Sequence, residues 1–241
     1  MEQQDLPSLD QQKDFSVPLN FHPLSNSEEE KRLINKHRPK RVRIFKHDFL
    51  ESLTLVEYQT IFKVWIPVLI AFIIWGNLEN QLSLLQNVAT IFSGILIWTL
   101  AEYLIHRFPF HYSPKSEWGK KLVYQMHGNH HDDPNDPLRG VMPIAPAILY
   151  LSIIYLIFYL IIPHFYLKVF FGGFLVGYLC YDGIHYYTHH GKPKNKIGKY
   201  LRKVHLVHHV HDDSMFGISS PLWDIILGTY VKKGYKIPKE F

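Results

Sequence analysis

An uninterrupted apolar segment, Val141–Ile162, constrains the fold more than any other feature of the chain. Its 22 residues include no Asp, Glu, Lys, Arg or His. As a helix that rises about 1.5 Å per residue, this segment matches the hydrocarbon core of a bilayer, which is about 30 Å thick. Soluble domains rarely contain such a run. The segment therefore predicts a membrane-spanning helix.

Three further apolar blocks predict three further membrane helices. They run from about Tyr58 to Trp75, from about Leu85 to Leu104 and from about Phe165 to Tyr181. A short polar link at residues 77–81 joins the first two blocks, and Pro163-His164 joins the last two. Short links favour antiparallel neighbours. We therefore predict an all-α, multi-pass fold with four transmembrane helices in two hairpins.

The basic residues predict how this fold is oriented. Of the 26 Lys and Arg residues, 24 lie before residue 58, between residues 106 and 140, or after residue 182. Two hairpins bring these three segments to one side of the membrane. Lys and Arg concentrate on the cytosolic side, so we expect both termini and residues 106–140 in the cytosol. The basic residues form no surface interleaved with aromatic residues, and we expect no nucleic-acid partner.

The polar N-terminal stretch and the single cysteine set further limits. Residues 1–20 contain no apolar core of a signal peptide. We expect residues 1–44 to form a polar tail without an independent domain, followed by one domain over residues 45–241. Cys180 is the only cysteine. It can form neither a disulfide within the chain nor a thiolate metal site.

Histidine is the compositional outlier, with 16 residues in 241. Ten of them form two pairs and two triplets: His106 and His111; His127, His130 and His131; His185 and His189; His205, His208 and His209. Residues at i, i+3 and i+4 share one face of a helix, so each triplet is expected to aim three rings at one point. The first pair is not co-facial on a regular α-helix, and Pro109 within it predicts a helix end or a bend.

This pattern predicts a metal centre built from imidazoles. Neutral imidazole binds Fe, Zn, Cu or Ni, whereas Mg and Ca prefer oxygen ligands. Because one ion takes about four to six ligands, ten histidines predict two metal ions. Ligand type alone does not separate iron from zinc. Glu102 and Asp182, close to His106 and His185, are candidates to hydrogen-bond the metal-bound rings. No catalytic group beyond the metal centre is predicted.

The order of these motifs resembles the fatty acid hydroxylase superfamily, and within it the fatty acid 2-hydroxylases that act on sphingolipid acyl chains. The motifs that carry the resemblance are Glu102-Tyr103-x-x-His106-Arg107-x-x-Phe110-His111, His127-Gly128-x-His130-His131, His185-x3-His189-His190 and His205-x2-His208-His209. Residues 45–51, 136–139 and 217–224 support it. The similarity extends from about Phe45 to Tyr230.

The resemblance implies a fold, an activity and partners. It implies four membrane helices in the endoplasmic reticulum and a cytosolic helical cap, with the ten grouped histidines as ligands of a dimetal centre. The metal would be iron in the working enzyme, although a purified sample can carry zinc. The implied reaction uses O2 and electrons to hydroxylate C2 of a very-long-chain acyl group in ceramide or another sphingolipid. The implied electron donor is a separate cytochrome b5.

Two other functions stay open at this point. One is a related membrane oxygenase, such as a sterol C-4 or C-5 oxidase or an acyl desaturase, which would yield an altered sterol or a double bond. The other is a non-catalytic zinc-binding or zinc-transport membrane protein. Transport requires polar ligands deep within the membrane spans, and Val141–Ile162 contains neither histidine nor carboxylate.

Overall fold

The structure, a computed structural model, describes residues 43–231, and the regular elements in this range are helices. Four of them are long and apolar enough to span a membrane: α3 (Tyr58–Asn80), α4 (Leu84–Ile105, extended to Phe110 by a wider turn), α7 (Ile144–Ile161) and α8 (His164–His190). The prediction of an all-α fold with four transmembrane helices is confirmed. The predicted polar tail over residues 1–44 lies almost wholly outside the described residues, and the domain division stays a prediction.

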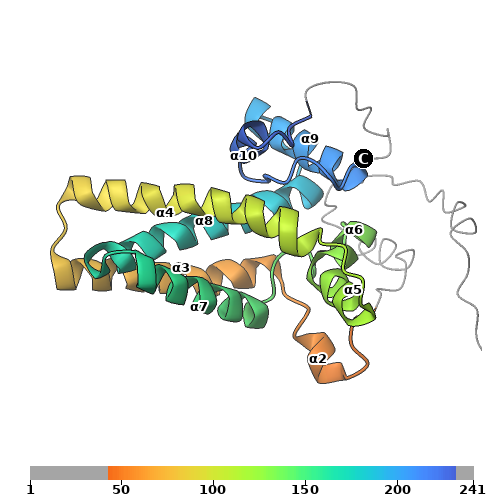
Figure 1. The fold of residues 1–241 in the computed structure, drawn as a ribbon, viewed down its shortest axis with the longest axis horizontal. Coiled ribbons are helices and arrows are strands. Elements are labelled where there is room, and N and C mark those ends of the chain that lie inside the picture. Colours follow the sequence, from red (N-terminus) through yellow and green to blue (C-terminus); the bar gives the residue numbers. More distant parts are fainter. Residues whose placement is uncertain (1–42, 232–241) are drawn as a thin grey trace, which may run out of the picture. The chain divides into compact units, whose positions relative to one another are not determined.

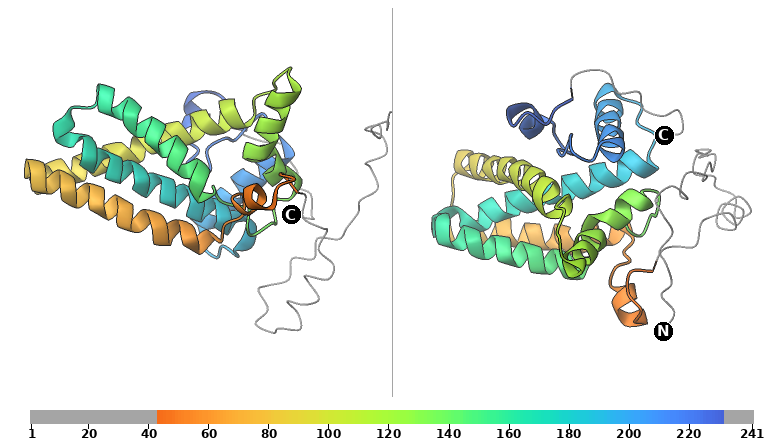
Figure 2. Two further views of the ribbon diagram at one scale, coloured as in Figure 1. Left: turned by 90° about the horizontal axis from the view of Figure 1, so that it is seen from below. Right: turned by 45° about the vertical axis from the view of Figure 1, so that its right-hand side comes forward.

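The two hairpin turns lie at one end of the helical bundle. Residues 81–83 join α3 to α4, and residues 162–163 join α7 to α8 (Figure 1). Towards the opposite end the short elements form a cap, as Figure 2 shows from two further sides. These elements are α2 (Asp48–Ser52), the π-helical turn η2 (His106–Phe110), α5 (Glu117–Val123), the π-helical turn η3 (Tyr124–Gly128), α6 (Asn129–Asp132), α9 (Lys196–Val210) and α10 (Leu222–Ile226), which lies beside α4.

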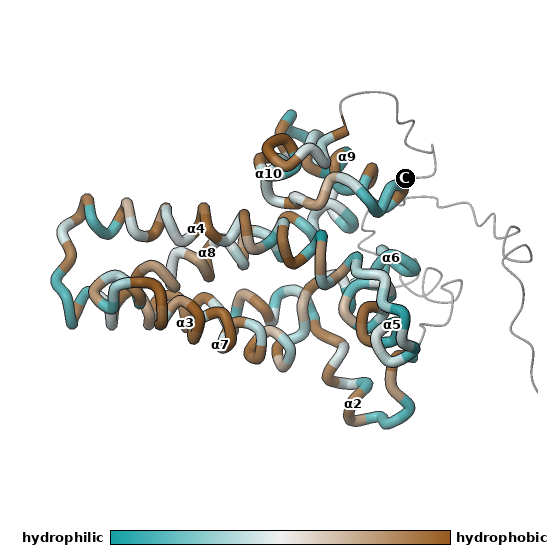
Figure 3. The backbone as a smooth tube through the Cα atoms, in the orientation of Figure 1, coloured by the Kyte–Doolittle hydropathy of each residue, from teal (hydrophilic) through white to brown (hydrophobic). Residues whose placement is uncertain are grey.

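Hydropathy separates the bundle from the cap. Apolar residues dominate α3 and α7, whereas hydrophilic residues are frequent in α5, α6 and α9 (Figure 3). The large side chains on α7 that remain exposed in the protein are apolar, among them Leu149, Ile153 and Leu160. An apolar helix surface of this extent and length matches the hydrocarbon core of a bilayer. The bundle is therefore the membrane-embedded part, and the cap lies outside it.

Helix α8 is the centre of the bundle. In its membrane-spanning window 72% of the residues are buried, whereas the figure for α3 and for α7 is 17%. The reason is that α8 packs along both α3 and α4, so it separates the two helices of the first hairpin. The predicted hairpins are correct as chain connections, but each helix of the first hairpin has its main contacts with α8.

Two glycines allow α4 and α8 to cross closely. A Cβ atom on Gly94 would lie 2.2 Å from the carbonyl oxygen of Phe170, and one on Gly173 would lie 2.3 Å from that of Ile91. Both separations are far below van der Waals contact, and in each case the obstacle is backbone, which cannot rotate away. Small residues at a membrane helix crossing let the two backbones approach. The α4–α8 contact therefore depends on the absence of these two side chains.

Substituting Gly94→Ala is expected to destabilise the bundle, because the added methyl group forces α4 and α8 apart. Overpacking of this kind costs about 1–3 kcal/mol. The measurement is the thermal unfolding midpoint in detergent. The matched control is Gly183→Ala on α8, where the new Cβ would meet only the ring of Phe62 at 3.2 Å. Equal midpoints for the two variants would show that the crossing is looser than described.

Candidate metal centre

The ten histidines singled out by spacing lie together in the cap and form two groups of five. The first group comprises His106, His111, His127, His131 and His208. The second group comprises His130, His185, His189, His205 and His209. In each group the candidate ligand nitrogens lie within 4.8 Å of one another. The two groups adjoin, with the rings of His131 and His209 4.4 Å apart.

The expectation that each triplet aims three rings at one point is wrong. His127 and His131 belong to the first group, but His130 belongs to the second. Likewise, His205 and His209 belong to the second group, whereas His208 belongs to the first. On a helix the residues i+3 and i+4 point to either side of residue i, about 100° apart. Each triplet therefore joins the two groups instead of filling one.

A π-helical turn brings the first pair, His106 and His111, into one group. The turn η2 spans His106–Phe110 and includes Pro109. Its wider i to i+5 repeat brings residues five apart nearly above one another. The irregularity predicted at Pro109 is present, and the two ring centroids lie 5.1 Å apart. A second π-helical turn, η3, directly precedes α6 and contains His127. The pair His185 and His189 needs no such device, because both lie on the continuous helix α8.

The distances between ring nitrogens fit a bound metal ion. His127 Nε2 lies 3.0 Å from His106 Nε2 and 3.1 Å from His131 Nε2. In the second group His205 Nε2 lies 2.7 Å from His189 Nε2 and 3.1 Å from His209 Nε2. Nitrogens bound at about 2.0–2.1 Å to one ion are spaced at roughly 3 Å. One nitrogen facing two others in this way is better explained by a shared ion than by hydrogen bonds between rings.

Ring nitrogens without a hydrogen-bond partner also fit a metal. Within the described part of the chain, the buried Nε2 atoms of His111 and His208 have no such partner. A buried polar atom without a partner is costly. Coordination of an ion would satisfy both atoms. An all-imidazole donor set of this kind suits iron or zinc.

The grouped histidines that lie outside the membrane spans are held neutral, as metal ligands must be. Burial lowers the pKa of His127, His130, His205 and His208 well below its usual value, and neighbouring histidines add to the effect. Burial together with His111 lowers the pKa of His131 to about 4, although Asp212 opposes the shift. At neutral pH these rings therefore carry a free lone pair.

Backbone carbonyls of the 214–219 loop orient two rings of the first group. His106 Nδ1 donates a hydrogen bond to Phe216 O at 2.6 Å, and His208 Nδ1 donates one to Ser214 O at 2.8 Å. With the proton on Nδ1, each Nε2 is free to bind an ion. Between these carbonyls Met215 adopts a left-handed conformation with φ of 57°. Few residues other than glycine adopt this conformation.

Two buried carboxylates hold this loop, and only one of them was expected near the site. Asp224 accepts hydrogen bonds from the backbone N–H groups of Phe216 and Gly217, both at 2.8 Å. Glu102 accepts from the N–H groups of Ile218 and Ser219 and from the Ser219 hydroxyl. Glu102 was expected to bond a histidine ring directly. Its carboxylate instead positions the loop whose carbonyls bond the rings. No sequence spacing relates Asp224 to the histidines, so sequence reasoning missed it.

Substituting Asp224→Ala is expected to lower metal content and turnover about 10–100-fold, the range seen when groups behind a metal ligand are removed. The physical reason is that the loop loses its anchor, and the rings of His106 and His208 lose their fixed acceptors. Metal per chain by elemental analysis is the primary measurement, with turnover as the second. Asp213→Ala is the matched control, since Asp213 is exposed on the same segment. A D224A protein with the metal content of D213A would contradict the assigned role.

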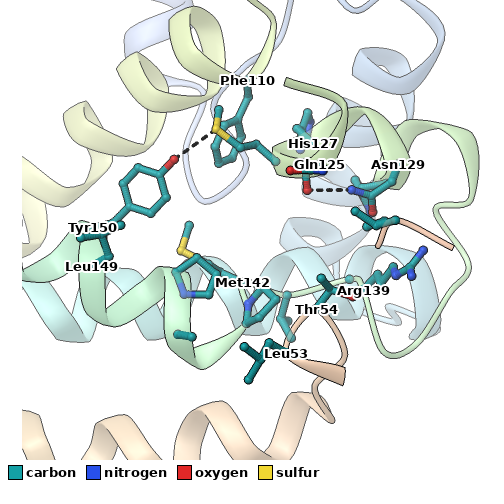
Figure 4. A pocket seen from close by; sticks show the side chains of 18 of the residues that line it. Leu53, Thr54, Phe110, Gln125, His127, Asn129, Arg139, Met142, Leu149 and Tyr150 are labelled. Atoms are coloured by element: carbon teal, nitrogen blue, oxygen red, sulfur yellow. Dashed lines mark hydrogen bonds between the residues drawn. The ribbon is translucent and has the colours of Figure 1, made fainter. Parts of the chain in front are cut away.

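Asp182, the other expected carboxylate, lies at a cavity next to the histidines. It is fully buried, beside Tyr178 and the backbone of Met142. The cavity has a volume of about 390 Å³ and is lined mainly by apolar side chains, together with His127 of the first group and His130 and His185 of the second. Figure 4 shows this pocket, with His127 and Phe110 opposite Met142 and Leu53. A cavity of this size and lining suits a small-molecule or lipid ligand.

Comparison with known families decides how this site is to be interpreted. A model of the fatty acid hydroxylase family matches residues 91–229, a range that includes all ten grouped histidines. The chain belongs to the fatty acid hydroxylase family. The resemblance drawn from the histidine motifs is thereby confirmed. The relatives of this fatty acid hydroxylase also indicate which kind of hydroxylase it resembles.

The curated relatives are hydroxylases of fatty acyl chains. A dihydroceramide fatty acyl 2-hydroxylase of Arabidopsis thaliana is 37% identical, over 90% of this chain and 92% of the relative. A ceramide very long chain fatty acid hydroxylase of Saccharomyces cerevisiae is 33% identical over 76% of this chain, and the match covers 48% of the relative. A solved structure of full-length scs7p, in which only the hydroxylase domain is visible, superposes with a TM-score of 0.73 at 32% identity, covering 80% of this chain and 73% of that one.

Proposed function

We propose that this fatty acid hydroxylase inserts a hydroxyl group at C2 of a very-long-chain fatty acyl group in ceramide or another sphingolipid, using O2. The observation that carries the proposal is the apolar cavity lined by histidines of both groups. The relatives named above support the choice of substrate, because they act on ceramide or dihydroceramide acyl chains.

The ten histidines are the proposed ligands of two metal ions, iron in the working enzyme. The balanced reaction takes R–H, O2, two electrons and two protons to R–OH and water. When bound, a redox-active metal pair supplies the activation of O2. The chain's own residues hold the ligand rings neutral and orient those of His106 and His208 through the 214–219 loop, and mainly apolar side chains line the cavity beside them.

The lining of the cavity suits a substrate with one polar and one apolar end. In Figure 4 the apolar ring and side chain of Tyr150 and Leu149 lie on one side, and the polar Asn129 and Arg139 lie on the other. His127 lies between the two sides. An acyl chain pointing toward Leu149, with its polar head near Asn129, would bring a carbon close to the head group next to the histidines. This arrangement supports hydroxylation at C2.

Exposed leucines at the cavity support a substrate that comes from the bilayer. Leu149 lines the cavity and is 62% exposed, and Leu50 on α2 also lines it and is 43% exposed. Leu149 lies near the start of the membrane helix α7. The cavity therefore has an apolar mouth where the cap meets the membrane part. A lipid can enter there without transferring its acyl chain through water.

The proposed location is the membrane of the endoplasmic reticulum, with the histidine groups and both termini in the cytosol. The distribution of Lys and Arg along the sequence supports this orientation. A protease-protection assay on microsomes with a C-terminal epitope tag tests it. Digestion of the tag in sealed microsomes is expected, and protection of the tag would refute the orientation.

The experiment for the function is lipid mass spectrometry of a yeast strain that lacks its own ceramide fatty acid hydroxylase and expresses this chain. Restored 2-hydroxy acyl chains in sphingolipids are the expected result, and chemical derivatisation locates the hydroxyl group. An acyl double bond or an altered sterol would identify one of the related oxygenases instead. Unchanged lipids, together with two zinc ions per purified chain, would favour the non-catalytic zinc protein.

A further inference from the structure

A strongly basic face lies on the cap, outside the site described so far. Residues 183–211 contain no Asp or Glu, but they contain five lysines and one arginine. All five lysines are exposed, and we call them the lysine face: Lys192, Lys194, Lys196, Lys199 and Lys203. A solvated protein surface normally mixes charges of both signs. A stretch of this length with cations alone produces a positive field that extends into solvent.

The lysine face lies behind the histidines on the same helix. On α9, Lys196, Lys199 and Lys203 follow an i, i+3, i+7 spacing and share one side. His205 and His208, both buried, point to the opposite side. An α-helix with its side chains is about 10–12 Å across. The lysines are therefore separated from both histidine groups by little more than the width of one helix.

The connection between α8 and α9 is fixed by an internal contact. Arg202 on α9 donates a hydrogen bond from Nη1 to the carbonyl oxygen of Gly191 at 2.6 Å. Gly191 directly follows α8, the helix that carries His185 and His189. Since this bond ties the segment that carries Lys192 and Lys194 to α9, the lysine face keeps a defined position relative to the second histidine group.

Apolar side chains among the lysines favour a protein as the partner. Ile197 is 73% exposed and Tyr200 is 37% exposed, and both lie between lysines in the sequence. A protein interface commonly has an apolar or aromatic centre within a charged rim, and Tyr is frequent among the residues that dominate binding. Lipid head groups would bind through the lysine charges and would not need Ile197 or Tyr200.

We propose that the lysine face is the docking surface of an acidic protein that carries single electrons. The proposal rests on the proposed function, because hydroxylation consumes two electrons that neither O2 nor the hydroxylated C–H group supplies. Two carrier molecules dock in turn. Each carrier is oxidised by one electron, and the histidine groups on the other side of α9 would hold the metal ions that receive it.

The test compares two charge-reversal variants in neutral phosphatidylcholine nanodiscs. The test variant is K196E/K199E/K203E, and the control is K115E/K120E/K121E around α5, which changes the net charge equally at three exposed lysines. Acidic residues in the first turn of α9 suit the helix dipole, so folding is expected to persist. Thermal unfolding and metal content of both variants verify this point.

The probe is the soluble haem domain of cytochrome b5, the donor implied by the family resemblance. Two quantities are measured: binding of its oxidised form to the nanodiscs, and reoxidation of its reduced form in stopped flow. For the test variant we expect at least a tenfold weaker affinity and slower reoxidation, with little remaining dependence on salt. The control variant is expected to match the wild type in both.

Further measurements separate the alternatives. Enzyme reduced in advance with dithionite needs no carrier, so its single turnover with O2 is expected to be equal in all three proteins. Loss of that turnover in the test variant alone would overturn the proposal, since the lysines would then act on the site itself. Equal carrier binding by the two variants would also overturn it. If the test variant differs from the wild type only when phosphatidylserine is added to the nanodiscs, the lysine face binds lipid head groups instead. Absence of turnover in the wild type, with carrier binding intact, would refute the hydroxylase and leave the docking surface standing.

Discussion

Substituting His208→Ala is expected to reduce the hydroxylated lipid product to below about one hundredth of the wild-type amount. Removing a group that only supports a metal ligand costs about 10–100-fold, so removing a ligand is expected to cost more. His208 contributes one of the five nitrogens of the first group, and its Nδ1 is already committed to Ser214 O.

The division into two groups also predicts which of the two metal sites each substitution empties. His208 and His209 are adjacent in the chain, but they belong to different groups. His208→Ala and His209→Ala are therefore each expected to lower the metal content from two ions toward one, by emptying different sites. Combining His208→Ala with His131→Ala, both in the first group, should leave one ion, whereas combining His208→Ala with His209→Ala should lower the occupancy of both sites.

The control is His164→Ala, at the turn between α7 and α8, where the exposed ring contacts Tyr159. It is expected to retain product and both metal ions. Elemental analysis and lipid mass spectrometry are run on the same preparations. If H208A yields wild-type product, or if both double variants retain the same metal content, the assignment of ligands to two separate ions is wrong.

Spacing in the sequence identified the ten histidines but not how they divide. Their number and positions are local properties of the chain, as are the four apolar segments. The division into groups depends on the roughly 100° between positions i+3 and i+4 and on which helix lies on each side. The π-helical turn at His106–Phe110 likewise became visible only in the structure, although Pro109 indicated an irregularity there.

Contacts between distant parts of the chain could not be predicted from one sequence. Glu102 bonds a loop more than one hundred residues away, at Ile218 and Ser219. The crossing of α4 and α8 at Gly94 and Gly173 depends on a pairing that hydropathy does not encode. Apolar periodicity indicates that a helix is buried on some side, but it does not name the partner. For this reason the central position of α8 was not foreseen.

After the histidine ligands, the buried ion pair between Glu51 and Arg139 is expected to be the feature of the molecule most sensitive to substitution. Glu51 Oε1 lies 2.6 Å from Arg139 Nη2, and the two side chains are only 12% and 6% exposed. Glu51 Oε2 also accepts hydrogen bonds from the backbone N–H groups of Ile44 and Phe45. One carboxylate thus holds the segment before α2 against the loop that leads into α7.

This segment needs such an anchor because it has little else to hold it. Helix α2 has five residues, and Phe49 within it is 66% exposed. Helices this short are not stable alone. Besides the ion pair, the backbone hydrogen bond from Val56 N to Leu138 O, at 3.0 Å, links the two segments. Because Phe45 and Leu53 line the cavity, release of the segment would open one wall of the proposed acyl site.

Substituting Glu51→Ala is therefore expected to cost about 3–5 kcal/mol, because the guanidinium of Arg139 stays buried without its carboxylate. The cost appears as faster proteolysis within residues 43–55 and as a higher KM for the lipid, while both metal ions are retained. Retention of the metals distinguishes this variant from the histidine variants. Replacing both partners with methionine is expected to cost less than either single replacement, since no unpaired charge is left buried.

Glu57→Ala is the matched control, because Glu57 is a nearby carboxylate that is exposed to solvent. It is expected to leave proteolysis, KM and metal content unchanged. If E51A and E57A behave alike, the ion pair does not hold the segment. If E51A loses its metal ions as well, the segment supports the metal centre and not only the cavity wall. A rise in KM for E51A without loss of metal would link the anchor to substrate binding, because the anchored segment contributes Phe45 and Leu53 to the cavity but no residue to the histidine groups.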